Sequence, residues 1–446
     1  MKTKSIFFSL LMLGCLGFSL MTSAREIKEI KETYSCERVI SATTPVCFKN
    51  KTGPLRVETW EKNSVKVDIS ISIDGDDDQV KKALDYIKNM NFQQSGDTIV
   101  FNTRFWKSMN SSSGIAIQNF HVFGNHVNLV LCDGEEITLR RLDLSFVMTM
   151  PKDNPLSLVQ AYENVTLPDL NGKITLDLYE SNLVAGKLPN CQLLKAKYGK
   201  AEIDSVQNII LNLYENKLVL RHAGDVTLNS KYTETEINSA GKMSINSYED
   251  KLQIIRHGDL GVKGKYTTFT LGDFVKGAFD LYECTLTAGN SDVVAMTAKY
   301  CTIKFISCKG AAITSYENKF SFDQVGDLKA GSSYSSFNIS QLDGSLIFTN
   351  SNEDKVKVNK VGKKFTGVNV DSKNSDVELG FEPGTLYKLD ADLKYSSFDY
   401  PKSAFREIRY HKEDDVFQFI GVTQGGDENT VPEVKLKMYE GGIRLK

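Results

Sequence analysis

The segment from Tyr214 to Tyr232 reads YENKLVLRHAGDVTLNSKY, and the segment from Tyr248 to Tyr266 reads YEDKLQIIRHGDLGVKGKY. Each contains two short runs in which apolar and polar residues alternate, which is typical of strands with one buried face. A Gly-Asp pair separates the two runs, and a tyrosine stands at each end. Each unit of about 17 residues therefore predicts a strand, a corner, a second strand and a second corner.

The same pattern extends along the middle of the chain. Eleven of the 18 tyrosines recur at intervals of 16 to 19 residues. They are Tyr162, Tyr179, Tyr198, Tyr214, Tyr232, Tyr248, Tyr266, Tyr282, Tyr300, Tyr316 and Tyr334. About ten residues after most tyrosines stands a glycine, a residue that accepts the backbone of a tight corner. Because no unit can bury its apolar face alone, the units must stack, and the sequence predicts a parallel β-solenoid.

The length of one coil is left open by the pattern, because two kinds of unit alternate. Glutamate follows the tyrosine in one unit, as at Glu215 and Glu249, and lysine precedes it in the next, as at Lys231. A coil of 34 residues would stack each glutamate on another at about 4.8 Å, which is unfavourable for like charges. We therefore favour a coil of 17 residues, in which Tyr214 stacks on Tyr232 and not on Tyr248.

Four segments follow from these signals: a signal peptide at 1–24, N-terminal strands with a capping helix and a loop at 25–150, solenoid repeats at 151–380, and C-terminal coils with a cap at 381–446. An open solenoid must protect the strand edges at its two ends. Alternating strands at 55–60 and 64–71, a helix that begins near the acidic run Asp74–Asp78, and a strand at 98–102 predict a β-helix-β cap. The acidic run lacks the ligand spacing of a calcium loop, so we expect no metal site there.

The N-terminus carries an export signal. Lys2 and Lys4 precede an apolar run that ends in small residues, which predicts cleavage after Ala24. Lipidation at Cys15 is the less favoured alternative. We expect an exported protein, located in the periplasm, on the outer surface or outside the cell, and not an integral membrane protein.

Export permits disulfides, and seven cysteines remain after the signal peptide is removed. Cys36 and Cys47, close in sequence, are the predicted disulfide pair. Cys284, Cys301 and Cys308 are expected to be buried thiols, because no Cys-x-x-Cys motif and no nearby histidine accompanies them.

The charge balance gives no electrostatic basis for binding nucleic acid, since 54 Lys and Arg residues stand against 56 Asp and Glu residues. The sequence predicts no cofactor. A glycan or another surface protein remains as the partner, and the oligomeric state is open.

The repeated tyrosines support two hypotheses. In the first, they only stabilise the corners, as regular stacking in a solenoid requires. In the second, partly exposed rings with neighbouring charges form a platform for a glycan or a partner chain. The candidate binding residues are Tyr214, Tyr232, Tyr248, Tyr266, Tyr282, Glu215, Glu249 and Glu283.

The segment NKTGPLRVETWEKNSVKV (residues 50–67), the helix after it, the tyrosine coils and the terminal MYEGGIRL (residues 438–445) together resemble the exported "putative adhesin" family of unknown function. That family is related to the auto-transporter adhesin head (GIN) domain of Gram-negative bacteria. The resemblance implies a right-handed β-helix and a non-catalytic, adhesin-like role in the cell envelope. It defines no site residues, and the Tyr-Gly motif of the family survives here only at Tyr198-Gly199.

A carbohydrate-active β-helix enzyme, a polysaccharide lyase or a glycosidase, is the alternative function. Such enzymes need clustered carboxylates with a base, or a carboxylate pair. The candidates are Arg221, His222, Asp225, Arg256, His257 and Asp259, which recur at one corner two units apart. His121 and His126 lie five residues apart on a segment expected to be a strand, so they should face opposite sides. We therefore predict a protein that is not an enzyme.

Overall fold

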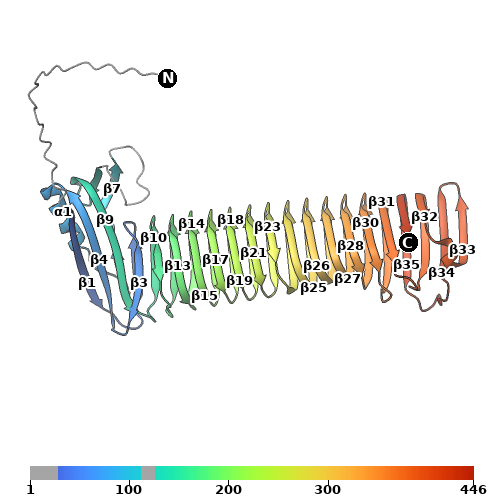
Figure 1. Ribbon diagram of the computed structural model, residues 1–446, viewed down its shortest axis with the longest axis horizontal. Coiled ribbons are helices and arrows are strands. Elements are labelled where there is room, and N and C mark those ends of the chain that lie inside the picture. The colour runs from blue at the N-terminus through green and yellow to red at the C-terminus, as the bar shows by residue number, and fades with distance from the viewer. Residues whose placement is uncertain (1–28, 112–125) are drawn as a thin grey trace, which may run out of the picture.

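The structure is a computed structural model that describes residues 29–111 and 126–446, and it forms a long parallel β-solenoid with a cap at each end (Figure 1). About 13 turns of about 17 residues each stack along the rod. The predicted all-β solenoid is confirmed, and so is the short coil. The signal peptide with Cys15 and Ala24, and His121, lie outside the described residues.

Each turn contributes one strand to each of two facing sheets. Strands with even numbers form sheet A: β10 (Leu156–Ala161), β12 (Ile174–Tyr179), β14 (Cys191–Lys197), β16 (Ile209–Tyr214), β18 (Val226–Lys231), β20 (Met243–Tyr248), β22 (Leu260–Lys265) and β24 (Phe274–Tyr282). Strands with odd numbers form sheet B: β11 (Val165–Leu167), β13 (Asn182–Leu188), β15 (Lys200–Val206), β17 (Lys217–His222), β19 (Glu234–Ser239), β21 (Lys251–Arg256) and β23 (Thr268–Leu271). All neighbours within a sheet are parallel.

Further along, the strands run through one corner without interruption. β25 (Thr285–Lys299), β26 (Thr302–Tyr316) and β27 (Lys319–Ser333) each extend sheet B with their first residues and sheet A with their last residues. The remaining coil strands are β28 (Ser336–Leu342), β29 (Ser345–Asn352), β30 (Lys355–Val361) and β31 (Gly367–Phe381). The repeat therefore continues past Tyr334, where the tyrosine series ends.

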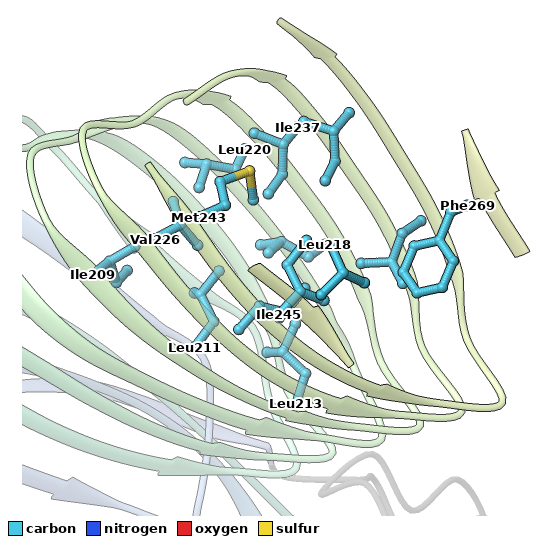
Figure 2. Packing of buried hydrophobic residues seen from close by; sticks show 14 of the residues in the cluster. Ile209, Leu211, Leu213, Leu218, Leu220, Val226, Ile237, Met243, Ile245 and Phe269 are labelled. Atoms are coloured by element: carbon cyan, nitrogen blue, oxygen red, sulfur yellow. The ribbon is translucent and has the colours of Figure 1, made fainter. Parts of the chain in front are cut away.

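The core fills the narrow space between the two sheets. Figure 2 shows side chains of both sheets pointing into this space, among them Leu211 and Leu213 from β16 and Leu218 and Leu220 from β17. All four are at most 4% exposed. Because apolar residues alternate with outward polar residues along each strand, one stripe of every strand is buried between the sheets.

Two kinds of corner join the sheets. We call the corner after each sheet A strand the Tyr corner. In the coils from Glu180 to Tyr334, this corner holds one residue other than glycine in the left-handed region, with φ of 45° to 60°. The corner after each sheet B strand, here called the Gly corner, contains no residue with positive φ from Gly172 to Gly344. The expectation that glycine supplies the unusual backbone is therefore wrong. Glycine is needed there for space, since a Cβ on Gly224 would lie 2.4 Å from the carbonyl oxygen of Gln207.

The N-terminal region contains β1 (Ile30–Val39), β2 (Val46–Asn50), β3 (Leu55–Trp60), β4 (Ser64–Gly75), α1 (Asp77–Lys88), β5 (Gln93–Ser95), β6 (Thr98–Asn102), β7 (Trp106–Ser111), β8 (Val127–Leu131) and β9 (Glu136–Pro151). The predicted helix is present, and its apolar face packs on β4 and β9. β3 belongs to the first coil, between β9 and β11, and not to the cap itself. The acidic run starts the helix, and Arg140 pairs with Asp74 and Asp76. β7 occupies residues that we expected to be part of a loop.

The C-terminal end closes by an inserted strand. β35 (Glu433–Leu445) lies between β31 and β32 (Lys388–Asp399) and runs parallel to both, as Figure 1 shows. Beyond β32, the antiparallel strands β34 (Val416–Thr423) and β33 (Phe405–Glu413) cover the last coil, and a short 3-10 helix, Lys402–Ala404, precedes them. The sequence of β35 does not indicate this place in the sheet.

Candidate functional site

The Tyr corner brings the repeated tyrosines together in one continuous row. At the last position of the sheet A strands, lysine and tyrosine alternate in register: Lys197 pairs with Tyr214, Tyr214 with Lys231, and Lys231 with Tyr248. At the next position, which has positive φ, tyrosine and glutamate alternate, for example Tyr232 and Glu249. Every coil therefore carries exactly one tyrosine of the series, at one of two adjacent backbone positions.

The rings of successive coils meet edge to face. Ten such contacts link the eleven tyrosines from Tyr162 to Tyr334, with ring centroids 5.5–5.8 Å apart and interplanar angles of 70–88°. This geometry is the one that aromatic quadrupoles favour. We call this row the tyrosine ladder. The five candidate tyrosines lie in its centre; Tyr232 is 44% exposed and Tyr266 is 43% exposed.

The candidate glutamates bind the ladder directly. The phenol of Tyr214 donates a hydrogen bond to the carboxylate of Glu215, and this bond raises the pKa of Tyr214 above its ordinary value. The same bond raises the pKa of four further tyrosines. These pairs are Tyr179 with Glu180, Tyr248 with Glu249, Tyr282 with Glu283, and Tyr316 with Glu317. Every second coil therefore fixes one phenol to one carboxylate.

The lysines of the Tyr corner have no carboxylate partner. Lys197, Lys231, Lys265 and Lys299 are exposed, and within residues 29–111 and 126–446 none of them forms an ion pair. The ammonium of Lys231 lies 5.6 Å from the ring centroid of Tyr248, a cation–π contact. On sheet B, by contrast, lysines pair with carboxylates, as in Lys200 with Glu202 and Lys217 with Glu234.

Sheet A is hollowed on its outer face beside the ladder. One hollow of about 500 Å³ is lined by Asn212, Asn229 and the strand-end residues Lys197 to Tyr248. A second hollow of about 890 Å³ continues from it over Ala278, Ala295 and the neighbouring coils to Gly331. Asn246 lines both hollows, so they adjoin along the outer face of sheet A. We call the two hollows together the sheet A groove.

The floor of the groove was not among the residues predicted from the sequence. It contains a row that stands two residues before the strand end in every coil. The row comprises Asp177, Lys195, Asn212, Asn229, Asn246, Lys263, Asp280, Thr297 and Thr314. Asn229 donates a hydrogen bond of 3.0 Å to the side-chain oxygen of Asn212. The signal was present in the sequence as a polar residue at a fixed offset from each lysine or tyrosine.

Another hollow, of about 520 Å³, lies on the sheet B side near the C-terminal end, between Lys355 and Arg444. Two of the three carboxylates that line it have partners, because Glu378 pairs with Lys446 at 2.7 Å and Asp399 with Arg444 at 3.4 Å. This hollow lacks the repeated lining of the sheet A groove.

The residues considered for catalysis lie elsewhere. His222 aligns with Arg256 two coils away, with Ser239 between them, and its Nδ1 lies 2.9 Å from the Ser239 hydroxyl. His257 packs on Phe274, and burial lowers its pKa. Asp225 accepts the backbone N–H of Lys242 at the next Gly corner. None of these residues lines the sheet A groove.

The predicted disulfide is not formed, since Cys36 and Cys47 are both free buried thiols. Cys36 lies on β1, which pairs with β4, whereas Cys47 lies on β2, between β6 and β10. Closeness in sequence therefore does not bring them together in the sheet. Cys284, Cys301 and Cys308 are buried thiols, as expected. The backbone N–H of Cys284 donates to the sulfur of Cys301 at 3.3 Å.

Among the described residues, no group of three or more His, Cys, Asp or Glu side chains is placed to hold a metal ion. His126 lies exposed just before β8. No helix in the same part of the chain is both long and apolar enough to cross a membrane.

Comparison with known proteins adds little to this geometry. No protein-family model matches the chain, and no curated protein is similar to it, so the family resemblance stays a prediction. A crystal structure of a "putative cell adhesion protein" from Clostridium sporogenes aligns with 93% of this chain and 99% of its own. The identity is 9% and the TM-score is 0.16, and at that score the similarity supports no conclusion on fold or function.

Proposed function

We propose that the protein is an exported, adhesin-like binding protein that holds an extended glycan chain along the sheet A groove without cleaving it. The observation that carries this proposal is that the groove runs over successive coils with a polar side chain at one register position in each. A polymer of similar units meets a polar side chain at each coil, about 4.8 Å apart. Hydroxyl and amide groups on the floor suit sugar hydroxyls, and tyrosines form one wall.

The carboxylates of the groove argue against glycoside hydrolysis. Asp177 and Asp280 are the acids that line the two hollows, and six coils separate them in register. That separation is about 29 Å, whereas the two carboxyl groups of a glycosidase lie about 5 to 9.5 Å apart. A catalytic pair cannot form from these two side chains.

The proposal is tested by electrophoresis of residues 25–446 through gels that contain different polysaccharides, each gel being stained afterwards for polymer. We expect retardation by at least one polymer and no clearing of the stain. Clearing would identify a carbohydrate-active enzyme instead. Unchanged mobility in every gel would contradict glycan binding and direct the search to a protein partner.

A matched pair of variants locates the binding surface. Ala278→Trp with Ala295→Trp fills the floor of the groove, and both positions are exposed on sheet A. Thr270→Trp with Thr287→Trp makes the same change on the exposed face of sheet B, at the neighbouring coils. We expect the first pair to abolish retardation and the second to leave it unchanged, with equal melting temperatures. Loss of retardation in both would contradict the assignment to sheet A.

A further inference from the structure

We infer that the glycan is an acidic polysaccharide that carries one carboxylate on every second sugar. This inference rests on the proposed function, and it names the chemistry of the ligand. Three observations carry it: the sign of the charge along the groove, the absence of partners for that charge, and its spacing.

The groove is basic although the protein is nearly neutral. Lys195, Lys197, Lys231, Lys263 and Lys329 line the two hollows, against Asp177 and Asp280. Within the described part of the chain, no carboxylate pairs with any of these lysines. The lysines of sheet B pair with Glu202 and Glu234 instead. Ammonium groups without a carboxylate partner on sheet A, in contrast to the paired ones on sheet B, favour an anionic ligand on sheet A.

The ladder also separates the two signs of charge. Lysines stand at the strand-end position, on the side of the groove, and glutamates at the next position, where they accept hydrogen bonds from the tyrosines. An anionic chain in the groove therefore meets ammonium groups and is kept from the glutamates of the ladder by a wall of rings. The chain would lie along one side of the ladder only.

The spacing of the strand-end lysines, of which Lys197 and Lys231 line the groove, defines the density of charge on the ligand. Lys197, Lys231, Lys265 and Lys299 occupy one register position in every second coil. Their spacing is therefore about 9.6 Å, twice the strand spacing of about 4.8 Å. In an extended chain of pyranose rings, a disaccharide advances by a similar distance. A chain with one carboxylate in each disaccharide would therefore place one carboxylate beside each lysine of this row.

The same spacing disfavours nucleic acid. A single strand carries one charge about every 3.4 Å, far denser than this row of lysines. Single-stranded nucleic acids also need open aromatic faces for their bases to stack on. In the tyrosine ladder, the edge of one ring covers the face of the next.

The test uses hyaluronan, in which every second sugar is a uronate, with hydroxyethyl cellulose as the neutral polymer and poly(dT) as the nucleic acid. Binding of residues 25–446 is measured by calorimetry at low and at physiological ionic strength. We expect hyaluronan to bind, salt to weaken binding, and affinity to rise with each disaccharide added to a short oligosaccharide.

Two variants with the same change in net charge separate local recognition from bulk charge. Replacing Lys197, Lys231, Lys265 and Lys299 by Gln removes the row, and replacing Lys200, Lys217, Lys251 and Lys319 by Gln removes four charges from sheet B. We expect the first variant to bind hyaluronan about tenfold more weakly or worse, and the second to change affinity by less than about twofold.

Each other outcome contradicts the inference. Equal loss in the two variants would mean that net charge alone attracts the polymer. Equal binding of poly(dT) would identify a nucleic-acid surface. Binding of neutral polysaccharides but not of hyaluronan would refute the acidic ligand and leave the proposed function standing, whereas failure of all glycans would refute both.

Discussion

Tyr214 and Tyr232 meet edge to face across one coil, with ring centroids 5.7 Å apart and an interplanar angle of 88°. Tyr214 is the last residue of β16, whereas Tyr232 stands one position later, in the corner after β18. The step to Tyr232 therefore spans 18 residues and the step on to Tyr248 spans 16. The alternation of intervals in the sequence reflects a zigzag of rings about a coil of constant length.

The first prediction concerns the stability that the ladder supplies. Tyr248 contacts Tyr232 and Tyr266 with centroids 5.8 and 5.5 Å away. Because an edge-to-face pair contributes about 0.5–1.5 kcal/mol, Tyr248→Ala should lower the free energy of unfolding by about 1–3 kcal/mol. Tyr248→Phe keeps the ring and should lower it by less than about 1 kcal/mol. Urea unfolding followed by circular dichroism measures both, and equal losses would show that the hydroxyl group is what matters.

A triple variant distinguishes the two hypotheses on the tyrosines. If replacing Tyr214, Tyr248 and Tyr282 together by Ala lowers the melting temperature but leaves glycan retardation unchanged, the ladder only stabilises the corners. Weaker retardation together with an intact melting profile would assign the rings to the ligand.

The second prediction concerns alkaline pH. Hydrogen bonds to glutamate raise the pKa of Tyr214, Tyr248 and Tyr282 in the folded protein. A raised pKa gives stability that is present below the unfolded value, about 10, and is lost as the pH rises through the folded value. The free energy of unfolding should therefore fall above about pH 10. Replacing Glu215, Glu249 and Glu283 by Gln should make the tyrosinate absorbance appear at a lower pH. The same replacement should also reduce the loss of folding free energy above about pH 10.

The control for this titration is Glu236→Gln, an exposed carboxylate on sheet B. It removes charge without touching the ladder, so the absorbance curve should stay at its original pH. A shift of similar size in the control would show that net charge, and not the hydrogen bond, sets the tyrosine pKa values.

The coil was predictable because its signals are local and repeated. Alternation in runs such as Lys217–His222 defines the buried face, and the tyrosine intervals define the period. Like-charge repulsion between glutamates argued for 17 residues, and the contact of Tyr214 with Tyr232 confirms it. The same repetition located the row of lysines and glutamates, although not the side of the ladder on which each lies.

Features that depend on distant pairing were not predictable. β35 enters between β31 and β32, strands that precede it by many residues, and nothing in its alternation distinguishes that place from the outer edge. The groove floor was missed because its residue types differ from coil to coil, from Asn229 to Asp280 and Thr297. Only stacking shows that these unlike residues form one row.

The third prediction uses two glycines with different surroundings. A Cβ on Gly326 would lie 2.3 Å from the carbonyl oxygen of Lys309, whereas a Cβ on Gly261 would meet nothing within 4 Å. Neither residue has a positive φ. Gly326→Ala should therefore destabilise by about 1–3 kcal/mol, as overpacking does, and Gly261→Ala should be neutral or stabilise by up to about 1 kcal/mol. Thermal melting compares them, and equal effects would contradict the role of close approach at the Gly corner.

The fourth prediction concerns the carboxylate buried inside the Tyr corner. Asp250 is 6% exposed and accepts hydrogen bonds of 2.6 Å from Ser230 and from Ser247 and one of 2.7 Å from the backbone N–H of Thr233. Asp250→Ala leaves these donors without a partner and should destabilise by about 2–4 kcal/mol. Asp250→Asn keeps an acceptor and removes a buried charge, so it should change stability by less than about 1 kcal/mol at pH 7.

The direction in which the stability of the Asp250→Asn variant changes with pH tests whether burial or hydrogen bonding dominates the pKa of Asp250. Burial raises the pKa of Asp250, against the hydrogen bonds from Ser230 and Ser247, which lower it. A raised pKa gives stability that is present below the unfolded value, about 3.9, and is lost as the pH rises through the folded value. The Asn variant has no such loss, so its stability relative to the parent should increase as the pH rises above the unfolded value. If the urea midpoint of the Asn variant instead falls relative to that of the parent as the pH rises, the hydrogen bonds outweigh burial and the carboxylate is held in its charged form.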